Sequence, residues 1–113
     1  MTGLDFNHPR KAIADYMNQN PICRGVHNIR FSCDTYIGEK PTRNDVSSAF
    51  LEIRDKYNEI ILAADSNCQD IFPHCESHIN INESEIAYIS GCLIICTHNP
   101  LGLKQTISIH PQL

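Results

Sequence analysis

The chain has 113 residues, with 13 acidic residues against nine Lys and Arg, and a formal net charge of −4 at pH 7. This length suits one domain whose core is large enough to fold without covalent cross-links, so we expect a single globular domain over residues 1–113. The negative charge argues against a phosphate-backbone partner, and no stretch approaches the ~20 apolar residues that cross a bilayer, so neither a nucleic acid nor a membrane is an expected partner.

The first predicted element is a short helix that begins at Asn7-His8-Pro9. A polar residue followed by Pro is typical of a helix start. The apolar positions at helical spacing are Ala12, Ile13, Tyr16 and Met17. Because the residue before a proline is pushed out of helical geometry, the helix should end at Asn20-Pro21. A strand over His27–Cys33, with Ile29 and Phe31 on one face, and a turn at Gly38–Pro41 should follow.

The longest predicted element is a helix from about Asn44 to Ala64. Thr42 and Asp45 before it resemble a capping box, with Asp in place of the usual Glu. The apolar positions that recur at three- and four-residue steps are Val46, Ala49, Phe50, Ile53, Tyr57, Ile60, Ile61 and Ala64. A competing interpretation ends the helix at Asn58 and makes Glu59–Asp65 a buried strand, but the periodicity favours the helix.

The last part of the sequence is rich in residues that favour strands. After a polar loop over Ser66–Ser77, the predicted strands are Glu85–Ser90, Gly91–His98 and Leu103–His110. Ser90-Gly91 and Asn99–Gly102 supply the turns between them. The predicted fold is therefore α+β, with two helices packed on one face of a mostly antiparallel sheet in the order α-β-α-β-β-β.

Positive charge is confined almost entirely to the first half of the chain. Eight of the nine Lys and Arg lie between Arg10 and Lys56, and residues 57–103 contain none. The acidic residues of that second stretch are Glu59, Asp65, Asp70, Glu76, Glu83 and Glu85. Because this half cannot neutralise its own charge, its acids must face water, a metal ion or a basic partner.

The six cysteines are expected to be free thiols in the cytoplasm. Residues 1–5 lack the charged start and apolar run of a signal peptide, so nothing directs the chain to an oxidising compartment. On the predicted strand 91–98, Cys92, Cys96 and His98 share one face with Ile94. We expect the two thiols to pack as small apolar residues against the long helix.

A loop cluster carries the residue types that zinc prefers. Cys68, His74, Cys75 and His78 lie within eleven residues around Pro73, and four such ligands would complete a tetrahedral site. The spacing fits no standard zinc knuckle, and the adjacent His74 and Cys75 cannot easily bind one ion. A surface loop is therefore favoured over a metal site, and no cofactor is expected.

Two functional hypotheses follow from these features. The first is a small cytosolic protein-binding module, an acidic inhibitor of immunity- or antitoxin-like type that shields a basic protein partner, possibly a toxin. Its partner surface would comprise Asp65, Asp70, Glu76, Glu83 and Glu85. The alternative is a small metal-independent ribonuclease-like toxin domain whose acid, base and phosphate clamp are His98, Lys104, Thr106 and His110. The acidic surroundings of these four residues would repel RNA, so the inhibitor hypothesis is preferred.

Overall fold

The computed structural model describes residues 8–20, 26–64 and 76–111, which form one α-helix, seven strands and two short 3-10 turns. In chain order they are α1 (Pro9–Gln19), β1 (Val26–Ile37), β2 (Lys40–Arg54), η1 (Asp55–Tyr57), β3 (Glu59–Ala64), β4 (Glu76–Asn80), η4 (Ile81–Glu83), β5 (Glu85–Ile89), β6 (Cys92–His98) and β7 (Lys104–Ile109). No helix in these ranges has the length and apolar character needed to span a membrane.

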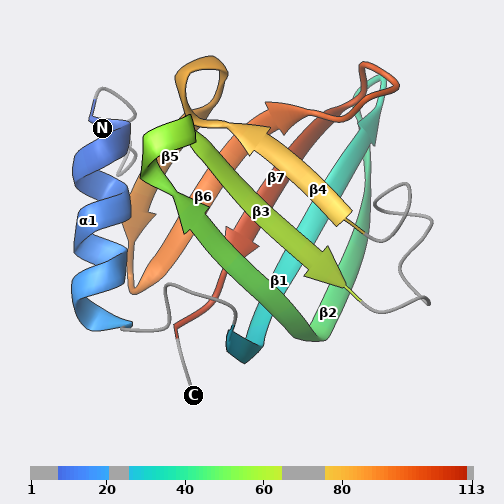
Figure 1. Cartoon of the computed structure of the whole chain (residues 1–113). Coiled ribbons are helices and arrows are strands. Elements are labelled where there is room, and N and C mark those ends of the chain that lie inside the picture. The colour runs from blue at the N-terminus through green and yellow to red at the C-terminus, as the bar shows by residue number, and fades with distance from the viewer. Residues whose placement is uncertain (1–7, 21–25, 65–75, 112–113) are drawn as a thin grey trace.

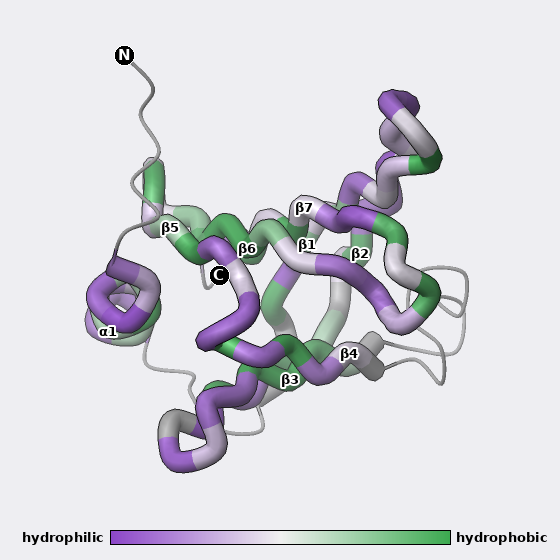
Figure 2. Tube along the Cα trace, turned by 90° about the horizontal axis from the view of Figure 1, so that it is seen from above, coloured by the Kyte–Doolittle hydropathy of each residue, from purple (hydrophilic) through white to green (hydrophobic). Residues whose placement is uncertain are grey.

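The seven strands form one antiparallel sheet in the order β4-β3-β2-β1-β7-β6-β5. The sheet is curled, so that β3 and β4 pass in front of β1 and β7 and run across them (Figure 1). Seen from above, β5, β6, β7 and β1 make one layer and β3 and β4 lie in another (Figure 2). The two layers enclose the core between their inner faces.

Strand β2 belongs to both layers. Its first part pairs with β1, from Ile37↔Lys40 to Val26↔Leu51, and its last part pairs with β3, from Ala49↔Ala64 to Arg54↔Glu59. The register of β1 against β2 shifts on either side of Ile29. Such irregularities increase local bending and twist, which is the feature that lets one strand leave one layer and enter the next.

Helix α1 lies along one side of the curled sheet and packs against β5 and β6 (Figure 1). Its buried residues are Ala12, Ile13 and Tyr16, as the sequence predicts. The Tyr16 ring meets Tyr88 edge to face at 6.2 Å between centroids, and its hydroxyl donates to the His110 carbonyl oxygen at 2.9 Å. At the other end, Arg10 donates to Asn58 Oδ1 in the turn before β3. The helix thus bridges the two layers.

The core is formed mainly by aliphatic side chains from every strand. Its largest fully buried members are Tyr16, Phe31, Ile29, Leu51, Ile60, Leu62, Ile79, Ile81, Ile86 and Leu93. Burial of this much apolar surface stabilises the fold by roughly 1.5–3 kcal/mol for each large side chain.

The predicted second helix does not exist, so the expectation of two helices on one face of the sheet, in the order α-β-α-β-β-β, is wrong. Residues 44–64 instead form the second part of β2, the 3-10 turn η1 and the strand β3. Leu51, which the helical stripe omits, is fully buried between Ala49 and Ile53, as a strand with period two requires. Asn58 has a positive φ of 53°, a conformation that Asn tolerates and that ends the turn into β3.

The three predicted C-terminal strands are confirmed, but the faces of β6 are reversed from the expectation. Leu93 and Ile95 point into the core, whereas Cys92, Ile94 and Cys96 are half-buried on the other side. The described residues contain no long helix for the two thiols to pack against. Strand β4, over Glu76–Asn80, replaces the end of the predicted loop.

Candidate functional site on the outer face of the sheet

The side of the β5–β6–β7–β1–β2 layer that points away from the core, here called the outer face, collects most of the polar side chains of the later strands. Residues directly opposite one another in an antiparallel sheet lie on the same side. One row across the outer face therefore runs through Glu85, Cys96, Thr106, Asp34 and Arg43. A second row contains Ile94, Ser108, Ser32 and Asp45.

The four residues of the ribonuclease hypothesis all lie on or beside these strands, but they divide into two groups. His98 is directly opposite Lys104, and Thr106 comes two residues later on β7. His110 follows Lys104 by six residues, which corresponds to about 20 Å along an extended strand. One phosphate group therefore cannot contact both histidines in this arrangement.

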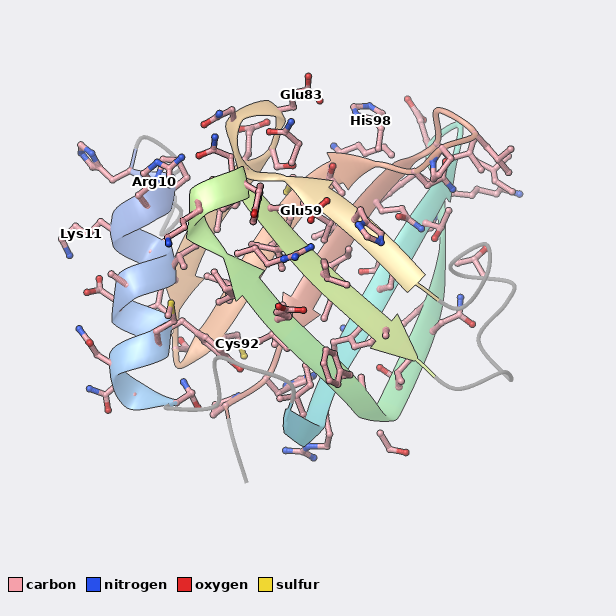
Figure 3. All side chains as sticks on the ribbon, viewed as in Figure 1. Arg10, Lys11, Glu59, Glu83, Cys92 and His98 are labelled. Atoms are coloured by element: carbon pink, nitrogen blue, oxygen red, sulfur yellow. The ribbon has the colours of Figure 1, made fainter. Side chains whose placement is uncertain are left out.

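The end of the outer face near His98 is exposed to solvent. Lys104 Nζ lies 5.5 Å from the centroid of the Tyr36 ring, so its charge faces an aromatic ring of β1. Thr106 Oγ1 is 4.0 Å from Cys96 Sγ. His98 itself projects from the end of β6, on the same side of the molecule as Glu83 (Figure 3).

His110 occupies the opposite end of the outer face and is fixed by three other elements. Its Nε2 is 3.3 Å from Ser32 Oγ on β1, and its Nδ1 is 3.9 Å from Cys92 Sγ on β6. Its carbonyl oxygen accepts the Tyr16 hydroxyl from α1, and its N–H donates to the Arg30 carbonyl oxygen at 2.9 Å. The sequence interpretation considered His110 and Cys92 separately and missed Ser32.

The described cysteines are free thiols in different environments, in agreement with the sequence expectation. Cys33 is fully buried on the inner face of β1. Burial raises the pKa of its thiol to about 11; the contact with Thr35 Oγ1 opposes this shift and the Asp34 charge adds to it. A thiol held neutral in this way is chemically inert. Cys92 and Cys96 are half-buried on the outer face, and the other three cysteines fall outside the described residues.

Two of the five acids predicted to bind a partner stand at one corner of the molecule. Glu83 in η4 and Glu85 at the start of β5, together called the acidic corner, are both exposed (Figure 3 labels Glu83). Neither forms an ion pair with the described residues. Glu76 begins β4 without a described side chain, and Asp65 and Asp70 lie outside the described residues.

The acids of β1, β2 and β3 have positive neighbours. Glu59 contacts His78 Nδ1 at 3.0 Å and Arg54 at 3.6 Å. Arg43 lies 3.8 Å from Asp34 and 3.6 Å from Asp45. Among the acids whose side chains are described, only Glu39, Glu83 and Glu85 lack an ion pair with described residues, and the last two stand together at the acidic corner.

Short polar contacts hold the backbone of the acidic corner. Asn80 Oδ1 accepts a hydrogen bond from the Asn82 N–H at 2.9 Å, which begins the 3-10 turn η4. Ser84 Oγ donates to the Asn80 carbonyl oxygen at 2.8 Å and lies 3.2 Å from Thr97 Oγ1 on β6. The two carboxylates are thus carried by a backbone that is tied to the sheet.

Of the four zinc candidates, only His78 falls within the described residues. It is exposed on β4 and contacts Glu59. The described residues contain no group of three or more His, Cys, Asp or Glu placed to hold a metal ion. Cys68, His74 and Cys75 lie in the stretch 65–75, outside those residues.

No protein-family model matches the chain, and no curated protein or solved structure is significantly similar to it. Its function must therefore be inferred from its own residues and contacts. The described surface offers two features of functional interest, the acidic corner and the group formed by Ser32, Cys92 and His110.

Proposed function

We propose that this protein is a small protein-binding module that presents its acidic corner to a basic partner protein, as an immunity- or antitoxin-like inhibitor would. The observation that carries the proposal is the exposure of Glu83 and Glu85 without an ion-pair partner in the described residues. Charges left unpaired on a fixed backbone give directional attraction to an oppositely charged surface.

The position of the acidic corner supports this role. η4 and the start of β5 lie at the border of the sheet, because β5 is an edge strand. The contacts of Asn80 and Ser84 hold the corner before binding, so little conformational entropy is lost when a partner docks. The carboxylates would meet Arg or Lys on the partner and occupy a site that otherwise holds phosphate.

A matched pair of charge reversals tests the proposal. Glu83→Lys with Glu85→Lys changes the acidic corner, and Glu39→Lys with Asp45→Lys changes two exposed acids of β2 and the turn before it. β2 is four strands from β5, about 19 Å across the sheet. A partner is first captured by chemical cross-linking from the source cells and identified, and its association rate is then measured by stopped-flow.

We expect the acidic-corner variant to associate about 10-fold more slowly at low salt, with a smaller change in dissociation rate. High salt should reduce the difference, because the Debye length is about 8 Å at physiological ionic strength and shorter above it. Equal effects of the two double variants would contradict the proposal. If the purified protein cleaves tRNA and His98→Ala abolishes the cleavage, the ribonuclease hypothesis would be favoured over the inhibitor hypothesis.

A further inference from the structure

The group formed by Ser32, Cys92 and His110 brings a thiol, an imidazole and a hydroxyl together from three strands. The imidazole lies between the other two, with Nδ1 3.9 Å from Cys92 Sγ and Nε2 3.3 Å from Ser32 Oγ. Cys92 is the first residue of β6, His110 directly follows β7, and Ser32 lies within β1. This is the arrangement of a nucleophile, a base and a residue that orients the base.

Two hydrogen bonds hold the backbone of His110, which carries the imidazole. Tyr16 donates to the His110 carbonyl oxygen, and the His110 N–H continues the ladder to Arg30. A Cβ placed on Gly91 would lie 3.0 Å from Pro111 Cγ, so the residue after His110 packs directly against the turn that leads into Cys92. Gly91 also has a φ of +82°, so a side chain is disfavoured there for two reasons.

The three side chains differ in access to solvent in the way a reactive thiol requires. Ser32 is only 3% exposed, whereas Cys92 and His110 are partly exposed. Cys33 is fully buried, and Cys96 contacts a threonine hydroxyl rather than an imidazole. Among the described cysteines, only Cys92 combines access to solvent with a neighbouring base.

We infer that Cys92 is a nucleophilic thiol, with His110 as its general base and Ser32 as the positioning residue, and that it exchanges with small disulfides of the glutathione type. Nδ1 of His110 accepts the thiol proton, and Nε2–H donates to Ser32 Oγ. The Cys92 thiolate then attacks one sulfur of the disulfide, so that a new S–S bond forms as the original S–S bond breaks. The departing thiolate takes the proton from the imidazolium, and no net oxidation occurs.

We favour disulfide exchange because Cys92 and His110 together supply the groups that this reaction requires. The reaction requires a thiolate and a proton source for the leaving sulfur, and one imidazole provides both in turn. An ordinary thiol is only a few per cent ionised at pH 7, so a neighbouring base raises the attacking fraction by at most about 30-fold. The contacts among Ser32, Cys92 and His110 lie apart from the acidic corner, so this thiol chemistry does not depend on the proposed protein partner.

The test measures the reaction of native protein with oxidised glutathione at pH 7. Cys23, Cys68 and Cys75 lie outside the described residues, so all three are first changed to Ser. Intact-mass spectrometry with peptide mapping then locates the mixed disulfide in a protein that retains His110. We expect modification at Cys92 first, no fast phase in Cys92→Ser, and an unchanged fast phase in the matched control Cys96→Ser.

His110→Gln should slow the reaction of Cys92 about 10-fold while the far-UV circular dichroism spectrum stays unchanged. Ser32→Ala should slow it by a smaller factor, and this effect should disappear in the His110→Gln background, since Ser32 acts through the imidazole. If Ser32 had only a structural role, Ser32→Ala would slow the reaction of Cys92 by the same factor with His110 present and in the His110→Gln background. Modification of Cys96 as fast as Cys92, or an unchanged rate in His110→Gln, would overturn the inference.

Discussion

The inner and outer faces of the same strands carry similar residue types in opposite environments. On β6, Ile95 is fully buried in the core, whereas its neighbour Ile94 is half-buried on the outer face with Cys92 and Cys96. The thiols divide in the same way, since Cys33 lies inside and Cys92 outside. For these isoleucines and thiols, the side of the sheet that a residue occupies, rather than its chemical type, decides whether it packs in the core or remains accessible to solvent.

Truncating one isoleucine on each face gives the largest expected contrast. Ile95→Ala should lower the free energy of unfolding by about 2–5 kcal/mol, because it leaves a cavity between the two layers. Ile94→Ala, one residue away and of the same size change, should lower it by about 1 kcal/mol, because its side chain already meets solvent. Urea denaturation of both variants measures the difference, and equal losses would mean that the faces of β6 are assigned wrongly.

The buried thiol should make the protein sensitive to alkali. The pKa of Cys33 rises from its ordinary value of 9.0 to about 11 on folding, so the folded state holds the proton more tightly. The contribution of the Cys33 thiol to the free energy of unfolding is therefore fully present below pH 9. It is lost as the pH rises from 9 through 11, because the thiol ionises in the unfolded chain before it ionises in the folded protein. Between pH 8 and pH 11 this group should lower the free energy of unfolding by about 2 kcal/mol.

Cys33→Ala provides the comparison, because every other titratable group is common to both proteins. The variant should be less stable than the wild type at pH 8, through lost packing, and the gap should narrow by about 2 kcal/mol at pH 11. Denaturation midpoints measured at both pH values report this change. Parallel pH profiles would show that Cys33 does not experience the buried environment described above.

Charges on the outer face should contribute the least to stability. Arg43 stands between Asp34 and Asp45 at 3.6–3.8 Å, and its side chain is more than half exposed. Arg43→Gln should therefore change the free energy of unfolding by less than about 0.5 kcal/mol, because solvent screens such pairs. Thermal unfolding at low and high salt measures this effect. A loss of more than about 1 kcal/mol in the free energy of unfolding would mean that charged residues of the outer face stabilise the fold.

Local patterns predicted the helix and the last three strands, whose signals lie within a few residues. Pro9 marks the start of α1, and the positive φ angles at Ser90 and Gly91 confirm the turn between β5 and β6. The second half of β2 was misread because Phe50 interrupts its alternation and extends a helical stripe. The alternation of Ala49, Leu51 and Ile53 and the uninterrupted apolar run after Glu59 were the available signs of two strands.

The candidate site depends on pairings that no local pattern contains. Ser32 and His110 are 78 residues apart, and they meet because β7 pairs with β1. Strand alternation placed Cys92 and Cys96 on one face but did not show which face the core would cover. The acidic corner was predicted only in part, because ion pairs such as Glu59 with Arg54 join residues from both halves of the chain and leave Glu83 and Glu85 uncompensated.

The position of β7 between β1 and β6 has a consequence for synthesis of the chain. β7 is the last of the seven strands to leave the ribosome, yet it joins the first strand to the β5–β6 hairpin. Until residues 104–109 emerge, one edge of β1 has no partner, and Phe31 and Cys33 lack the neighbouring Ile109 and Ile107 of β7. The complete sheet can therefore form only after translation of β7, and the nascent chain exposes an unpaired edge to chaperones or to other chains until then.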